Sequence, residues 1–454
     1  MRVHFIAIGG AAMHNLAIAL HLKGFEVTGS DDVVYEPSKT RLKNQGILPK
    51  QEGWHPENIT KRIDAIILGM HARIDNPELL KAQELGLKVY SYPEYIYEQS
   101  KNKIRVVIGG SHGKTTITSM ILHVLNFYKK DFDYLVGAQI AGFDNMVKLS
   151  DAPIIVIEGD EYLASPIDRR PKFHLYKANI GVISGVAWDH INVFPTFDSY
   201  KEQFCLFIDT IEPNGTLIYC EEDKVLKDLV ENHAVKNELT LIHYQIPSYR
   251  IDEGITYLKI EGGEVKINVF GKHNLMNLNA AKLVCNSIGV NSEDFYAAIS
   301  SFAGAAKRLE LLAENESSVI YKDFAHSPSK LQATISAVKE QFPDRKLIAC
   351  IELHTFSSLN EDFLKEYANT INGADIALVF IDEKTLLQKS LKPFTKDKII
   401  KGFSNDKLVF FNQSEKIKNY LQSLSMDNMN LLMMSSGTFG GIDLVTLANS
   451  ILKK

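Results

Sequence analysis

A glycine-rich turn between an apolar run and a helical pattern is the part of this sequence best suited to chemistry. Residues 106–108 predict a strand, and a helical spacing of apolar residues follows over residues 116–127. Such a turn directs backbone N–H groups and the positive end of the new helix at one point, where an anion is held without a side-chain clash. The residues expected to cradle a nucleotide phosphate are Gly110, Ser111, His112, Gly113, Lys114, Thr115 and Thr116.

Two side chains of this turn indicate the nucleotide. Lys114 is in a position to reach the terminal phosphates, and Thr115 supplies a hydroxyl of the kind that ligates nucleotide-bound magnesium. The general motif has a glycine six residues before the lysine, where this chain has Ile108. A solvated turn is the alternative interpretation, but the strand before and the helix after favour a chain that uses ATP and Mg²⁺.

Polar residues follow two further apolar runs. Residues 154–157 lead into Glu158 and Asp160, and residues 180–183 precede His190. The carboxyl ends of neighbouring parallel strands meet at one crevice, where such folds bind ligands. Taken singly, the acids are typical of a solvated strand end and His190 of a hydrogen-bonded core histidine. Together with the turn, they predict Lys114, Glu158 and His190 as catalytic residues, and Thr115 and Glu158 as ligands of one magnesium ion.

The start of the chain predicts a second binding turn. A strand over residues 3–8, a helix ending at Gly24 and a strand over residues 26–29 form a Rossmann-type unit with acidic residues at its end. The glycines do not match the dinucleotide fingerprint, and a tight turn that merely needs small residues is an equal alternative. The turn contains Gly9, Gly10, Ala11, Ala12 and Met13, and the strand end contains Ser30 and Asp31.

Alternating strands and helices along the chain predict an α/β fold with three domains in series. We expect a Rossmann-like domain over residues 1–103, a central ATPase domain of the P-loop type over 104–302, and a Rossmann-like domain over 303–454. Further strands are expected at residues 65–68, 347–351, 376–381 and 431–434. Residues 215–269 read as short strands joined by polar turns, followed by a helix over 275–288.

The composition excludes several classes of protein. The net charge of −5, with both signs interspersed, offers no basic stripe for nucleic acid. No apolar run approaches a membrane span, and the N-terminus predicts a strand rather than a signal peptide, so we expect a cytoplasmic protein without a membrane partner. The scattered Cys205, Cys220, Cys285 and Cys350 suggest buried thiols. The oligomeric state stays open.

The order of these motifs resembles the Mur ligase family of peptidoglycan synthesis along essentially the whole chain. The resemblance rests on residues 8–13, 110–116, 158–161 and 189–190, the His273-Asn274 pair with Asn277, and a basic hinge at Arg308. It implies an ATP-dependent ligase that activates a UDP-muramyl carboxylate as an acyl phosphate and joins it to an amino acid or peptide. A non-catalytic sensor that binds UDP-sugar and ATP is the alternative from another class.

Subgroup features of the family imply a substrate. Members that add later peptide components carry a carbamylated lysine where this chain has Phe204, so UDP-N-acetylmuramate itself is implied as the acceptor. Residues 158–162 and 434–442 resemble the subgroup that attaches L-Ala-γ-D-Glu-meso-diaminopimelate in peptidoglycan recycling. The L-alanine-adding subgroup is the alternative, because residues 354–357 resemble that subgroup. The chain differs from the usual family patterns at Gly185, Ala187, Ser327 and His354.

The resemblance also implies roles for further residues, and it makes His190 a ligand of a second metal ion. In the first domain, Gly9 to Met13 with Ser30, Asp31 and His71 are expected to grip the UDP group. Arg308 and Asp323 are expected to reach the ATP from the third domain. Asn274 and Asn277 would read the adenine edge, although Asn274 is also placed to cap a helix. Glu352 and His354 are candidates for binding the amine substrate and taking its proton.

Overall fold

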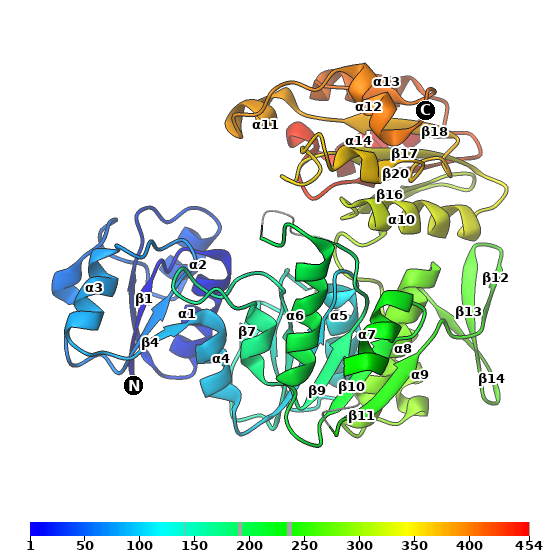
Figure 1. Cartoon of the computed structure of the whole chain (residues 1–454). Coiled ribbons are helices and arrows are strands. Elements are labelled where there is room, and N and C mark those ends of the chain that lie inside the picture. Colours follow the sequence, from blue (N-terminus) through cyan, green and yellow to red (C-terminus); the bar gives the residue numbers. More distant parts are fainter. Residues whose placement is uncertain (141, 189–192, 234–237, 454) are drawn as a thin grey trace. The chain divides into compact units, whose positions relative to one another are not determined.

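The computed structural model describes residues 1–140, 142–188, 193–233 and 238–453, and these contain four sheets (Figure 1). The chain packs as two units. One comprises Met1–Val186, Phe197–Gln245 and Ala280–Phe295, and the other Ala187–Thr196, Ile246–Asn279 and Tyr296–Lys454. The α/β class is confirmed, whereas the domain boundaries at 103 and 302 remain predictions.

The N-terminal sheet is wholly parallel, in the order β2-β1-β3-β4. Its strands are β1 (Arg2–Ile6), β2 (Glu26–Ser30), β3 (Ala65–Leu68) and β4 (Val89–Ser91). The helices are α1 (Ala11–Leu22), α2 (Ser38–Asn44), α3 (Pro77–Glu84) and α4 (Tyr92–Ser100), with the short η1 (Pro56–Asn58). The strand, turn, helix and strand predicted for the start of the chain are therefore present. Gly10, in the turn between β1 and α1, is the N-cap residue of α1.

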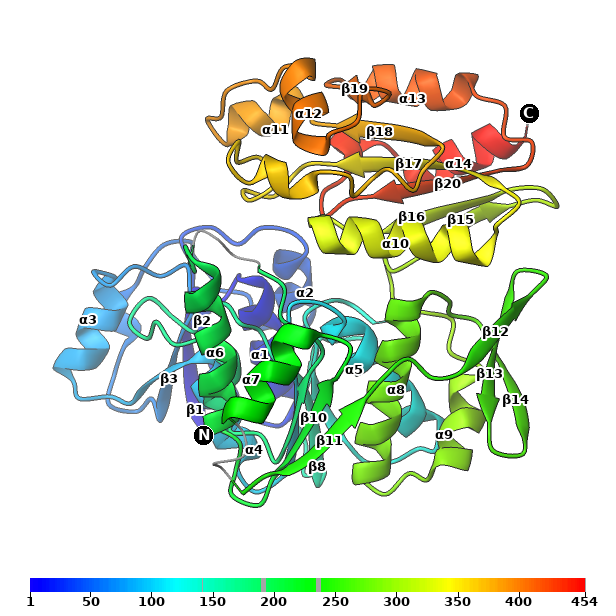
Figure 2. The ribbon, with the colours of Figure 1, turned by 45° about the vertical axis from the view of Figure 1, so that its right-hand side comes forward.

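The central sheet has the order β11-β10-β9-β5-β8-β6-β7, and its strands are parallel apart from β7. They are β5 (Ile104–Gly109), β6 (Asp133–Leu135), β7 (Val147–Lys148), β8 (Ile154–Glu158), β9 (Ile180–Ile183), β10 (Thr216–Cys220) and β11 (Thr240–Tyr244). Helix α5 (Lys114–Phe127) follows β5, and η2 (Lys172–Tyr176) follows β8. Helices α6 (Phe197–Asp209) and α7 (Lys224–His233) lie side by side over one face (Figure 2).

The prediction of only short strands over residues 215–269 was wrong at α7. Leu226 and Val230 on this helix are buried, whereas Lys224 and Asp228 are exposed. This spacing of one helical turn between apolar residues is the signal that was missed. After α7, the chain forms an antiparallel sheet of β12 (Tyr249–Asp252), β13 (Ile255–Ile260) and β14 (Gly263–Ile267), as the polar turns predicted.

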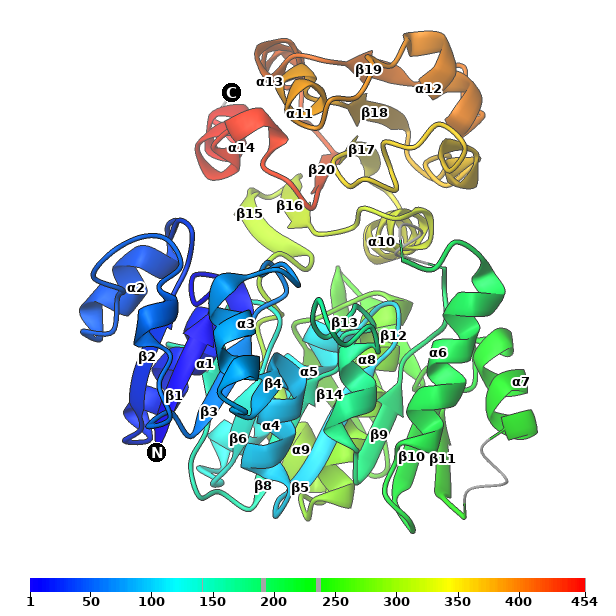
Figure 3. The same ribbon diagram turned by 60° about the vertical axis from the view of Figure 1, so that its left-hand side comes forward.

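The C-terminal sheet has the order β15-β16-β20-β17-β18-β19, with β15 antiparallel to the rest. Its strands are β15 (Glu310–Glu314), β16 (Val319–Asp323), β17 (Lys346–Glu352), β18 (Ile376–Phe380), β19 (Val409–Phe411) and β20 (Met429–Met434). Helices α10 (Pro328–Gln341) and α12 (Lys396–Phe403) pack on one face, and α13 (Ser414–Ser423) and α14 (Leu444–Leu452) on the other (Figure 3). The sheet is therefore buried on both faces, as parallel sheets require.

The remaining elements are α8 (Lys272–Ser287), α9 (Ser292–Ile299), α11 (Glu383–Gln388), η4 (Leu364–Tyr367) and η5 (Phe439–Gly441). Among the described residues, no helix is long and apolar enough to cross a membrane. The four cysteines are free thiols; Cys205 is half-buried, and the other three are buried as expected.

Candidate functional site

The turn between β5 and α5 is shaped by two glycines. Gly110 has φ +124° and Gly113, which caps α5, has φ +80°, in the left-handed region that favours glycine. A Cβ atom on Gly110 would lie only 2.8 Å from the backbone nitrogen of Ser184. The turn is also hydrogen-bonded to the segment that follows β9, since the Ser111 N–H donates to the Gly185 carbonyl at 3.0 Å. The start of α5 therefore lies at the carboxyl edge of the sheet. The first N–H groups of a helix have no partner within the helix, so they are available to a ligand there.

Lys114 is half-buried at the first position of α5. Its Nζ donates to the Gly110 carbonyl at 2.7 Å and to Glu161 Oε2 at 2.6 Å. Burial lowers the pKa of Lys114, but the carboxylates of Glu161 and Asp160 outweigh it and hold the pKa above its ordinary value. Lys114 is therefore a fixed cation beside the glycine turn.

Thr115 and Glu158 meet although they are far apart in sequence. The Thr115 hydroxyl donates to Glu158 Oε1 at 2.8 Å, and the Gly137 N–H donates to the other carboxylate oxygen at 2.8 Å. A hydroxyl and a carboxylate in contact are the ligands that nucleotide-bound Mg²⁺ takes, with phosphates and water completing its shell. The pair fits such an ion. No three His, Cys, Asp or Glu side chains of the described residues cluster so as to hold a metal by themselves.

Asp160 and His190 are the other residues predicted at this edge of the sheet. Asp160 pairs with Lys172 at 2.6 Å, which holds its carboxylate toward the segment leading into η2. His190 lies outside the described residues, so its predicted metal and catalytic roles stay predictions.

The N-terminal turn is fastened by Asp31. The Gly9 N–H donates to Asp31 Oδ2 at 2.7 Å, and a Cβ atom on Gly9 would lie 2.9 Å from that oxygen. Ala11 and Ala12 at the start of α1 are exposed, whereas Met13 is buried in the core. The exposed backbone of the turn and the helix N-terminus can therefore meet an anionic ligand, and the Met13 side chain cannot.

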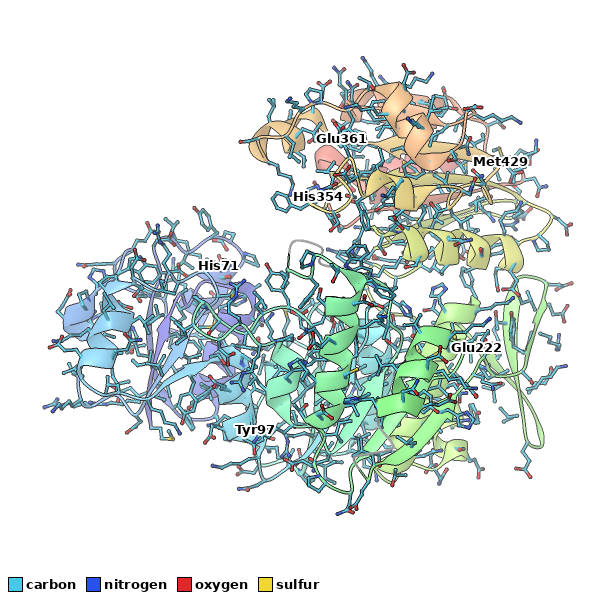
Figure 4. The ribbon with its side chains drawn as sticks, in the orientation of Figure 1. His71, Tyr97, Glu222, His354, Glu361 and Met429 are labelled. Carbon is cyan, nitrogen blue, oxygen red and sulfur yellow. The ribbon has the colours of Figure 1, made fainter. Side chains whose placement is uncertain are left out.

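Ser30 is buried beside this turn, whereas His71 is exposed. The Ser30 hydroxyl donates to Glu78 in the core and is not directed at a ligand, while its carbonyl accepts from the Ala7 and Ile8 N–H groups. The sequence-based expectation that the Ser30 side chain grips a ligand therefore needs correcting to a supporting role. His71 is exposed on the N-terminal part (Figure 4), and its Cδ2 would lie 3.7 Å from a Cβ atom on Gly10.

In the second unit, Asn274 and Asp323 both hold backbone groups. The Asn274 side-chain amide donates to the Phe270 carbonyl at 2.9 Å, and Asn277 is buried nearby on α8. Asn274 lies inside α8, which begins at Lys272, so it does not occupy the capping position that the alternative gave it. The Asp323 carboxylate accepts from the Leu309 N–H at 2.8 Å and the Ala325 N–H at 2.7 Å. The Arg308 guanidinium lies 4.4 Å from the centre of the Phe324 ring. The contacts of Leu309 with Asp323 and of Arg308 with Phe324 hold the segment that leads into β15.

Glu352 and His354 flank the loop that follows β20 (Figure 4 labels His354). Glu352 is buried, and its Oε2 accepts from the Ser435 hydroxyl and, at 2.8 Å, from the Phe439 N–H. A Cβ atom on Gly437 would lie 2.8 Å from Glu352 Oε2 and 2.8 Å from His354 Cγ and Nδ1. Glu352 therefore orders the loop, and half-exposed His354 is the group of the two that a ligand can reach.

Comparisons with known proteins agree along the chain. Residues 2–103 match the Mur ligase family catalytic domain, 108–285 the Mur ligase middle domain, and 307–437 the Mur ligase glutamate ligase domain. The UDP-N-acetylmuramate–L-alanine ligase of Carboxydothermus hydrogenoformans is 31% identical over 386 residues, which cover 83% of this chain and 80% of the relative. The chain belongs to the Mur ligase family. It is an ATP-dependent ligase that forms an amide bond.

Solved structures of two Mur ligases resemble this one. The UDP-N-acetylmuramate:L-alanyl-γ-D-glutamyl-meso-diaminopimelate ligase of Neisseria meningitides is 26% identical with a TM-score of 0.60, covering 66% of this chain and 98% of that one. The UDP-N-acetylmuramate–alanine ligase of Thermotoga maritima has a TM-score of 0.68 at 19% identity, covering 100% of this chain and 98% of that one. The second likeness shows the three-domain fold alone.

Asp31 gives this Mur ligase an expected dependence of stability on pH. Burial, with a hydrogen bond to Asp32, raises the pKa of Asp31 from 3.8 to about 6. Between these values the folded protein holds a proton that the unfolded chain has lost, so the free energy of unfolding falls as the pH rises from about 4 to about 6, by roughly 1–3 kcal/mol. Asp31→Asn should remove this slope in melting temperatures measured over that range; a variant with the wild-type slope would contradict the assignment.

Proposed function

We propose that this Mur ligase joins UDP-N-acetylmuramate to the tripeptide L-Ala-γ-D-Glu-meso-diaminopimelate, using ATP and Mg²⁺. One observation carries the choice of amine: residues 434–442, which resemble the peptide-adding subgroup, form the loop that Glu352 fastens beside His354. The Neisseria ligase, which bears the name of the peptide-adding enzyme, supports the choice.

The first step has to overcome repulsion between two anions. The lactyl carboxylate of UDP-N-acetylmuramate attacks the γ-phosphorus of ATP, and ADP leaves as the acyl phosphate forms. The Lys114 ammonium and the N–H groups of the turn before α5 offset this charge, and they are fixed before the reaction begins. Thr115 and Glu158 would hold the Mg²⁺ ion, which would supply further positive charge at the phosphates.

The second step forms the amide. The peptide nitrogen bonds to the carbonyl carbon of the acyl phosphate, inorganic phosphate leaves, and the nitrogen loses a proton. His354 is the proposed acceptor of that proton, because it is half-exposed beside the loop, whereas Glu352 is buried and already accepts two hydrogen bonds. The backbone of residues 9–12, held by Asp31, grips the UDP group, with His71 beside it.

L-alanine is the second candidate amine. The Carboxydothermus relative bears the name of an L-alanine-adding ligase and is 31% identical to this chain. A non-catalytic sensor is less well supported, since Lys114, Thr115 and Glu158 are all present. Thr115 is hydrogen-bonded to Glu158, and Lys114 is hydrogen-bonded to Glu161.

Phosphate release from ATP with UDP-N-acetylmuramate tests the choice of amine. We expect kcat/KM with the tripeptide to exceed that with L-alanine by about 10²-fold or more, as when a site pairs polar groups of one substrate that the other lacks. The reverse preference would move the chain to the L-alanine-adding branch. No turnover with either amine, while UDP-N-acetylmuramate and ATP still bind, would favour the sensor.

A further inference from the structure

Three side chains, from α5, α6 and the segment after β8, form a chain of hydrogen bonds that ends at the phosphate turn. Tyr200 on α6 donates its hydroxyl hydrogen to Glu161 Oε1 at 3.1 Å, and Lys114 on α5 donates to Glu161 Oε2 at 2.6 Å. Glu161 is 1% exposed and Tyr200 is fully buried. No step of the proposed reaction uses Glu161 or Tyr200.

Burying a carboxylate is costly unless charge and hydrogen bonds compensate it, and here both of its oxygens have partners. The arrangement leaves Lys114 little freedom of orientation. An ammonium group has three N–H donors, and two of them point at Glu161 and at the Gly110 carbonyl. With those two directions fixed, the direction of the third donor is fixed as well.

We infer that Glu161, held in place by Tyr200, is a positioning residue that orients the Lys114 ammonium for the phosphates of ATP. Lys114 keeps its two protein partners and turns its remaining donor to the nucleotide, so the cation does not have to be reoriented during phosphoryl transfer. The inference rests on the proposed role of Lys114 in binding phosphate.

The mildest test is Tyr200→Phe, which keeps the buried ring and removes only the hydroxyl. We expect kcat for phosphate release to fall about tenfold or more while KM for ATP changes little, because the carboxylate is less firmly held but the cation is still present. Tyr128→Phe is the matched control, since that hydroxyl donates to the Asp294 carbonyl at 2.9 Å at the other end of α5. Equal losses in the two variants would overturn the inference.

A double-mutant cycle separates positioning through Lys114 from an independent role. Glu161→Gln should lower kcat in the wild-type background and have no further effect in Lys114→Met. Lys114→Met leaves the buried Glu161 carboxylate without its cation. Adding Glu161→Gln to Lys114→Met should therefore raise the melting temperature above that of Lys114→Met alone. Losses that multiply, or a Glu161→Gln variant with wild-type kcat, would overturn the inference.

The same cycle distinguishes failure of this inference from failure of the proposed function. If Lys114→Met retains wild-type phosphate release, the assignment of Lys114 to the phosphates is wrong and the inference is overturned with it. If Lys114→Met is inactive but Glu161→Gln behaves as wild type, only the positioning role is overturned.

Discussion

Lys114→Met is expected to reduce phosphate release by about 10²- to 10³-fold or more, the loss typical of removing one preorganised group that stabilises developing charge. The substitution keeps a long unbranched side chain and removes the ammonium that contacts Gly110 and Glu161. Binding of UDP-N-acetylmuramate should persist, since the proposed UDP-binding turn is fastened by Asp31 on a different sheet.

Phosphate release and calorimetric binding of UDP-N-acetylmuramate, measured on the same preparation, check this prediction. Lys130→Met is the matched control, because Lys130 is exposed just beyond the other end of α5. Loss of both activity and binding would contradict the separate assignment of the two sites, and a nearly active variant would contradict the role of Lys114.

Gly437→Ala is expected to disable use of the amine substrate. The added Cβ would lie 2.8 Å from Glu352 Oε2 and from two atoms of the His354 ring, so at least one of these groups has to move. Because Glu352 is buried and bonded to the loop, the accessible change is displacement of His354 and of the loop itself. We expect kcat/KM for the amine to fall by about 10- to 10²-fold and the free energy of unfolding to fall by about 1–3 kcal/mol.

Initial rates at varied amine concentration measure this effect, and chemical denaturation measures the stability. Thr438→Ala, a change at the exposed next residue, should leave both near the wild-type values. If Gly437→Ala retains the wild-type kcat/KM for the amine, then His354 and this loop do not form the amine site.

Local pattern predicted much of the fold. The strand, glycine turn and helix around Lys114 were expected from residues 106–127 and are present as β5 and α5. The core strands near residues 347–351 and 431–434 were found because parallel strands buried on both faces are short continuous apolar runs. Helix α7 was missed because its short amphipathic pattern lies between strands, where polar turns dominate the composition.

Contacts between distant residues were harder to predict. Thr115 and Glu158 were assigned together by chemistry, and their hydrogen bond fits that assignment. The pairing of Lys114 with Glu161, 47 residues along the chain, depends on the order of β5 and β8 in the sheet, which the sequence pattern does not specify. The burial of Glu352 was likewise not predictable, because its partner Ser435 lies 83 residues away, just after the end of β20.

Phe204 packs α6 against η2 through aromatic rings. Its ring is fully buried, with its centre 5.6 Å from that of Phe173 and 5.2 Å from that of Tyr200. A phenylalanine side chain has no amine, so no carbamate can form on it. These aromatic contacts therefore hold α6 against η2 in the same way at any concentration of dissolved carbon dioxide.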